Sequence, residues 1–103
     1  MPFGVMGGEF QPTGHAHVLS NIEDFGMDVQ EAIDAPRAFA IEGELRLERG
    51  FSTETRQKLA DMGHKVVEPA APLGGGQAIE IDWKRGILTG ASEPRKDGCA
   101  LGY

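Results

Sequence analysis

Apolar and polar residues recur along the chain with changing periods, and the changes of period mark the expected elements. A short apolar run at residues 3–6 ends at Gly7 and Gly8, which is typical of a strand followed by a turn. The next apolar residues recur at helical spacing and predict an amphipathic helix: Val18, Leu19, Ile22 and Phe25. The chain therefore begins with a strand, a glycine pair and a helix.

A second, shorter helix is expected directly after the first. Gly26 stands where a glycine commonly ends a helix. Asp28 and Glu31 have the spacing of a capping box, in which each side chain binds the other residue's backbone N–H. The helix that begins there covers residues 29–35 and is stopped by Pro36.

The middle of the chain predicts a hairpin and a third helix. Alternating apolar and charged residues in 37–50, with a glycine near the centre, indicate two strands joined by a turn. Ser52 is a suitable N-cap for a helix over 53–62. We expect Leu59 and Met62 to be the residues of that helix that face inward.

The last third predicts strands. A strand over 65–69 is followed by a mobile loop in the glycine-rich segment 70–76. Alternation in 77–83, a turn, and a second run at 87–92 predict another hairpin. The expected order is β-α-α-β-β-α-β-β-β, which is an α+β fold.

Composition narrows the classes of function. With 103 residues the chain is expected to form a single domain over 1–103, and a net charge of −6 argues against a nucleic-acid partner. No apolar run is long enough to span a membrane, so we expect no membrane partner. The single cysteine, Cys99, excludes an internal disulfide, and the cellular compartment is undetermined.

Two short motifs invite a chemical interpretation that their surroundings do not favour. His15 and His17 are too close together to share a helix face and lack a third ligand at a recognisable distance, so we expect no metal site. The run 74–76 of three glycines could bind a phosphate group, but a strand rather than a helix is expected after it. A flexible loop is the better interpretation.

Arg37 and Arg95 each follow a proline that fixes the local backbone. One alternative is a helix stop or turn with a solvated charge. We favour structural ion pairs for both arginines, with carboxylates such as those of Asp34, Asp82 or Asp97.

The glycine pair is the remaining candidate for chemistry. No Ser/His/Asp arrangement and no paired carboxylates follow from the spacing. Gly7 and Gly8 follow a strand and precede a helix, a setting in which backbone N–H groups can point at an anion or a developing oxyanion. A plain turn is the alternative that the residues alone leave open.

Longer phrases of the chain resemble a known family. They are PFGVMGGEFQPTGHAHVLSNIEDFGMDVQEAIDAPR, GHKV, GGGQAIEID and GASEPRKDGCALGY. Together they resemble the C-terminal part of the small subunit of γ-glutamyltransferases (γ-glutamyltranspeptidases), and the resemblance runs over essentially the whole chain. Glu93 stands where many members carry aspartate.

The resemblance implies a fold and an activity. The fold would be part of the αββα sandwich of N-terminal nucleophile hydrolases, with antiparallel strands and packed helices. The activity would be transfer of γ-glutamyl groups from glutathione-like donors to water or amino acids, without a cofactor. An N-terminal threonine is the family's nucleophile, and backbone N–H groups matching those of Gly7 and Gly8 form its oxyanion hole.

The resemblance also implies partners. The nucleophile is absent from this chain, so the isolated chain is expected to be inactive and to require the nucleophile segment and the large subunit of the same enzyme. Strand faces left uncovered would favour self-association into a homo-oligomer. Two alternatives stay open: a stand-alone, non-catalytic interaction domain derived from that fold, and a metal- or small-ligand-binding module built on His15 and His17.

Overall fold

A computed structural model describes all residues, 1–103, and its contacts divide the chain into two compact units. The first unit comprises Met1–Ala35 and Gly74–Tyr103, and the second comprises Pro36–Leu73. The prediction of a single domain over 1–103 stays a prediction, and the two units are described separately.

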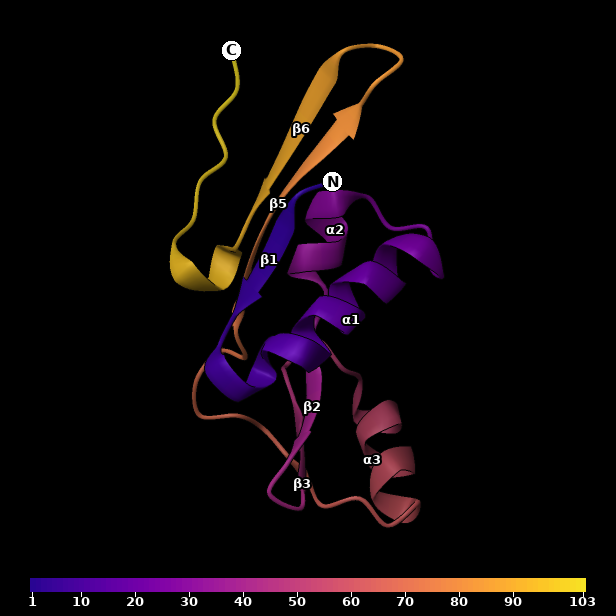
Figure 1. Ribbon diagram of the computed structural model, residues 1–103. Helices are drawn as coiled ribbons and strands as arrows, with labels where there is room; N and C mark the ends of the chain where they lie inside the picture. Colours follow the sequence, from indigo (N-terminus) through magenta and orange to yellow (C-terminus); the bar gives the residue numbers. More distant parts are fainter. The chain divides into compact units, whose positions relative to one another are not determined.

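The first unit is a three-stranded antiparallel sheet with two helices. Its strands are β1 (Phe3–Met6), β5 (Gly75–Asp82) and β6 (Ile87–Ser92), in the order β1-β5-β6. The helices α1 (Gln11–Glu23) and α2 (Val29–Asp34) pack against the sheet, as Figure 1 shows. Two 3-10 turns complete the unit, η1 (Gly8–Phe10) and η2 (Pro94–Lys96).

The core of this unit lies between the helices and the sheet. Its buried residues are Val5, Val18, Val29, Ala32, Ile33, Ala78 and Ala91, with Phe3, Ile22 and Met27 packed against them. The expected inner face of α1 is only partly correct, because Leu19 and Phe25 are exposed. The buried residues of α1 are Gly14, Val18 and Asn21. The buried face of the helix therefore carries smaller and more polar side chains than the predicted face.

Local capping signals set the boundaries of the helices. Asp28 and Glu31 form the predicted capping box at the start of α2. Gly26 adopts the predicted left-handed conformation (φ 66°), and its N–H donates to the Ile22 carbonyl. These interactions satisfy backbone groups that a helix end would otherwise leave without partners.

The other face of the β5–β6 hairpin is apolar and exposed. Ile81 lies opposite Leu88, and Ile79 lies opposite Gly90 two residues away, so these side chains share one face. Leu88 is 67% exposed and Trp83, at the tip of the hairpin, is 84% exposed. Apolar side chains thus cover the face of the sheet that the helices leave open.

The second unit contains β2 (Ala38–Ile41), β3 (Glu44–Leu47), α3 (Thr53–Asp61) and β4 (Val66–Val67). The β2–β3 hairpin is the predicted one, whereas β4 pairs with β3 in parallel, an exception to the expected antiparallel pairing. Ser52 caps α3 by accepting the Thr55 N–H, as predicted.

Met62 does not face inward as expected. It is 74% exposed, because it lies after the last residue of α3, where the chain leaves the helix. The element order agrees with the predicted β-α-α-β-β-α-β-β-β arrangement.

The triple glycine is not a mobile loop. Gly74, Gly75 and Gly76 are buried, and the last two begin β5, opposite Met6 and Val5 of β1. Because glycine has no side chain, it allows close packing at this point in the sheet.

None of the helices has the length and the apolar composition of a membrane-spanning segment.

Candidate active site

Gly7 and Gly8 lie directly after β1, at the start of η1. Gly7 has φ 138° and ψ 21°, and Gly8 has φ 61°. Both values of φ lie in the region that favours glycine. The residues alone left a plain turn and an anion site open, and the backbone shows a sharp bend at which two successive amides change direction.

Neither amide N–H of the pair donates a hydrogen bond within the structure. The Gly7 carbonyl accepts from Phe10 and the Gly8 carbonyl from Gln11, but the two N–H groups have no partner. Gly7 is half-buried and Gly8 is exposed, so solvent or a bound group can reach these donors. The pair therefore offers two adjacent donors to a bound group.

Packing around the two glycines is unequal. A Cβ atom on Gly7 would lie 3.2 Å from the Gly74 Cα and 3.3 Å from two side-chain atoms of Phe10. A Cβ atom on Gly8 would meet nothing within 4 Å. Gly7 is thus held between the start of β5 and η1, whereas Gly8 lies open.

His15 stabilises the outer edge of β1 beside the glycine pair. The Val5 N–H donates to His15 Nε2 over 3.2 Å, and His15 Nδ1 lies 2.7 Å from the Gln11 carbonyl oxygen. These partners require Nδ1 to carry the proton and Nε2 to accept. The ring of His15 also contacts that of Phe3, with centroids 5.5 Å apart.

The structure gathers no group of three or more His, Cys, Asp or Glu side chains that could hold a metal ion. His15 instead uses both ring nitrogens within the fold.

An open pocket of about 430 Å³ adjoins the end of β1. The residues that line it include Met6, Gly75, Gln77, His15 and Lys96. Met6, the last residue of β1, lines this pocket and directly precedes Gly7.

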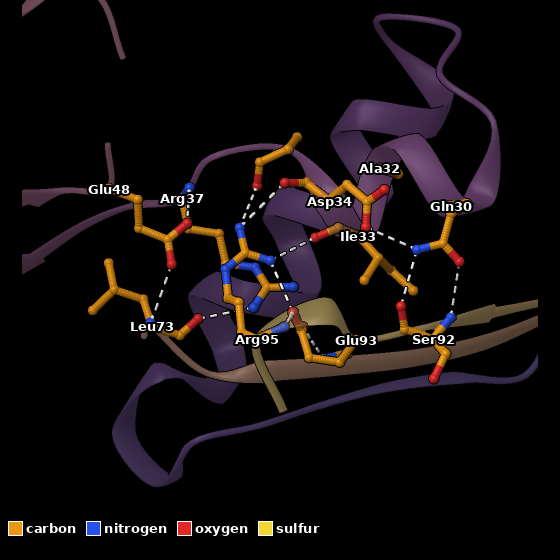
Figure 2. Close-up of polar contacts among 12 residues, drawn as sticks. Gln30, Ala32, Ile33, Asp34, Arg37, Glu48, Leu73, Ser92, Glu93 and Arg95 are labelled. Atoms are coloured by element: carbon orange, nitrogen blue, oxygen red, sulfur yellow. Dashed lines mark hydrogen bonds and ion pairs between the residues drawn. The ribbon is translucent and has the colours of Figure 1, made fainter. Parts of the chain in front are cut away.

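A buried ion pair joins the end of β6 to the end of α2. Glu93 is 1% exposed, and its Oε1 lies 2.9 Å from Arg95 Nη1. The Arg95 guanidinium also donates to the carbonyls of Ile33, Asp34 and Ala35, over 2.9, 3.3 and 2.8 Å (Figure 2). Carbonyls at a helix C-terminus lack partners within the helix, so Arg95 caps α2 with a positive charge.

The ion-pair partner of Arg95 is Glu93, which is not among the carboxylates predicted from the sequence. Asp34 contributes its backbone carbonyl instead. The pairing was not evident from the sequence, because it depends on the turn at η2. This turn brings the side chains of Glu93 and Arg95, two residues apart, into contact.

Gln30 makes a second connection between α2 and β6. Its side-chain amide donates to the Ser92 carbonyl over 2.9 Å and accepts from the Ser92 N–H over 3.0 Å (Figure 2). The Gln30 side chain therefore occupies the outer edge of β6 in the manner of a neighbouring strand. No signal in the sequence pointed to this residue.

Arg37 lies in the second unit and is completely buried. Its backbone N–H donates to Glu48 Oε2 over 2.9 Å, and Nη1 donates to the Leu73 carbonyl over 2.9 Å. The other Glu48 oxygen accepts the Leu73 N–H over 3.2 Å, as Figure 2 shows. Arg37 and Glu48 thus join the two ends of this unit.

Comparison with known proteins identifies the family. A family model described as gamma-glutamyltranspeptidase matches residues 1–103. The chain belongs to the γ-glutamyltranspeptidase family. The relationship predicted from the GG and GASEPR motifs is therefore confirmed.

Individual relatives of this chain bear several names. It is 40% identical to the glutathione hydrolase-like YwrD proenzyme of Bacillus subtilis, over 97% of this chain and 21% of the relative. It is 41% identical to the acylase ACY 1 proenzyme of Pseudomonas sp. (strain V22), over 78% of this chain and 14% of the relative. The chain thus spans about a fifth or less of the length of these relatives.

Solved structures agree with the fold. A cephalosporin acylase from Bacillus halodurans matches with a TM-score of 0.87 and 40% identity, over 99% of this chain and 20% of that chain. The predicted class, an α+β part of an N-terminal nucleophile hydrolase sandwich, is confirmed by this likeness and by the mainly antiparallel sheets with packed helices.

Proposed function

We propose that Gly7 and Gly8 supply the oxyanion-binding N–H groups of a γ-glutamyltranspeptidase-family enzyme. The observation that carries the proposal is the pair of adjacent amides that bend out of β1 and donate to nothing within the fold. Such donors stabilise the negative oxygen that forms when a nucleophile attacks an amide carbonyl.

The nucleophile is expected to come from residues outside this chain. The four threonines of the chain lie inside secondary-structure elements: Thr13 in α1, Thr53 and Thr55 in α3, and Thr89 in β6. By the family resemblance, an N-terminal threonine attacks the γ-amide with its own amine as base, and the leaving amine takes the proton. We therefore propose that the 103-residue chain alone is inactive.

Water or an amino acid then resolves the acyl-enzyme. Attack by water releases the acid, and attack by an amino group forms a new amide, so the same two glycine donors serve both reactions. The partners implied are the nucleophile segment and the large subunit of the same enzyme. The relatives are named as proenzymes and are much longer than this chain, which supports this proposal.

The donor is proposed to be a γ-glutamyl amide, because one relative is named as glutathione hydrolase-like. The names of the acylase relatives favour a second candidate, hydrolysis of an amide whose acyl group is not γ-glutamyl. Both candidates use the same oxyanion site and differ in the acyl group that the neighbouring residues accept.

Acyl-enzyme formation in a complete enzyme that carries this segment tests the proposal. Two anilides are compared, a γ-glutamyl anilide and a matched anilide that lacks only the α-amino group. Faster acylation by the γ-glutamyl compound supports γ-glutamyl transfer. Equal or faster acylation by the compound without the amino group contradicts it and supports the acylase alternative.

A further inference from the structure

Glu93 continues the β5–β6 ladder with its side chain. The last pair of that ladder is Gln77 and Ser92, so the following pair would place the Glu93 backbone opposite Gly76. The chain turns into η2 at this point, and the Gly76 N–H donates instead to Glu93 Oε2 over 2.6 Å. A buried carboxylate therefore takes the place of a backbone carbonyl at the start of β5.

The position of this carboxylate is fixed from its other side. Glu93 Oε1 accepts from the Arg95 backbone N–H over 3.0 Å and from Arg95 Nη1 over 2.9 Å. Arg95 is itself held by the end of α2, through the carbonyls of Ile33 and Ala35. Glu93 thus holds the Gly76 N–H in a fixed position. Every hydrogen bond from the end of α2 through Arg95 and Glu93 to Gly76 involves a charged group.

The start of β5 in turn supports the glycine pair. Met6 lies opposite Gly75, and the position of a Cβ on Gly7 lies only 3.2 Å from the Gly74 Cα. A shift of Gly74–Gly76 would therefore move Met6 and Gly7 as well, because Met6 is paired with Gly75 in the sheet and Gly7 packs closely against Gly74. Glu93 acts on the candidate donors through this short path.

We propose that Glu93 is a positioning residue that sets the orientation of the Gly7 and Gly8 N–H groups. The proposal rests on the proposed oxyanion function of the pair and adds a residue that determines its geometry. Replacement by glutamine keeps the size of the side chain but leaves one oxygen, which cannot serve Gly76 and Arg95 from both sides.

Backbone NMR of the full 103-residue chain tests the connection without any substrate. In Glu93→Gln, we expect exchange of the Gly76 amide with solvent to be about tenfold faster, as for loss of a hydrogen bond to a charged group. We also expect the Gly7 and Gly8 amide resonances to move. The matched control is Gln30→Ala, which removes both bonds to the neighbouring Ser92 but none to Gly76.

The control should leave the Gly7 and Gly8 resonances in place. Unmoved glycine resonances in Glu93→Gln, or equal movement in Gln30→Ala, would overturn the proposal. If Glu93→Gln does not fold, the same measurement on Glu93→Asp tests the proposal. This variant keeps the negative charge on a shorter side chain, so it changes the bond to the Gly76 N–H. Its Gly7 and Gly8 resonances must then move more than that of Gly26 in the same unit.

Kinetics of a complete enzyme separates this proposal from the proposed function. There, Glu93→Gln is expected to lower the acylation rate constant about tenfold with KM unchanged, because it disturbs donors needed mainly in the transition state. An unchanged rate constant with moved resonances shows that the glycine pair is not the oxyanion site. Unmoved resonances overturn the role of Glu93 and leave the oxyanion site standing.

Discussion

Replacement of Gly7 by alanine is the sharpest test of the backbone geometry at the candidate site. The added Cβ meets the Gly74 Cα at 3.2 Å and Phe10 side-chain atoms at 3.3 Å, on a residue with φ 138°. A conformation this unusual costs on the order of 1–3 kcal/mol for a residue with a side chain. We expect the backbone to relax, so that Gly7→Ala both destabilises the chain and displaces the two amides.

Gly8→Ala is the matched control for this substitution. Its φ of 61° lies in the left-handed helical region, and its Cβ would meet nothing within 4 Å. The conformation costs about 1–2 kcal/mol, and the stiffer unfolded chain returns about 0.4–1 kcal/mol. The net loss is therefore between about 0 and 1.6 kcal/mol, and no neighbouring atom forces the backbone to move.

Thermal unfolding and acylation kinetics check the comparison. For a chain of this size, each kcal/mol lowers the Tm by about 4–8 °C. We expect the larger fall for Gly7→Ala, together with a loss of acylation rate on the order of a hundredfold in a complete enzyme. Gly8→Ala should retain most of the rate. Equal Tm values and equal rates for the two variants would refute the reasoning.

Four further outcomes are expected. Arg95→Lys should lower the free energy of unfolding by about 1.5–3 kcal/mol, through loss of charged hydrogen bonds to the end of α2, and an unchanged urea midpoint contradicts this. The Arg49 guanidinium lowers the pKa of the Glu68 carboxyl through a hydrogen bond and its charge. The pKa of Glu68 is therefore lower in the folded than in the unfolded chain, so Glu68→Gln should be less stable than the parent at neutral pH. The difference in stability should vanish as the pH falls through the folded pKa. A difference that persists in acid contradicts this prediction. The isolated chain should release no chromophore from a γ-glutamyl anilide, and turnover that copurifies with the chain would disprove the expected inactivity. The exposed face around Leu88 should cause concentration-dependent self-association, which Leu88→Lys reduces in sedimentation; a strictly monomeric parent chain would count against it.

Local signals were sufficient to predict the order of the elements. The capping box of Asp28 and Glu31, the Ser52 cap and the glycine at position 26 act within a few residues, so the sequence displays them directly. The parallel pairing of β3 with β4 joins two strands that α3 separates in the sequence, so no short-range pattern specifies it.

Two errors in the predicted elements have different physical causes. Glycine-rich composition suggested a loop at Gly74–Gly76, but the same absence of side chains allows close packing of β5 beside β1. Met62 has the right spacing for the inner face of α3, yet the helix ends before it. Tertiary packing thus explains the first error, and the position of the helix end explains the second.

The candidate site was predictable only in part. The position of Gly7 and Gly8 after a strand suggested an anion site, and the family resemblance gave it a role that is still a proposal. Glu93 drew attention only as a departure from aspartate. Its burial and its bond to Gly76 depend on the turn at η2, which follows it directly, and on the end of α2, which is distant in sequence.

The most direct measurement of the central claim removes a single N–H group without adding a side chain. In a complete enzyme carrying this segment, the Gly8 amide is replaced by an ester, which keeps the backbone shape but lacks the donor. If the pair binds the oxyanion, the acylation rate constant should fall on the order of a hundredfold to a thousandfold with KM nearly unchanged. An acylation rate constant equal to that of the amide parent would contradict the claim.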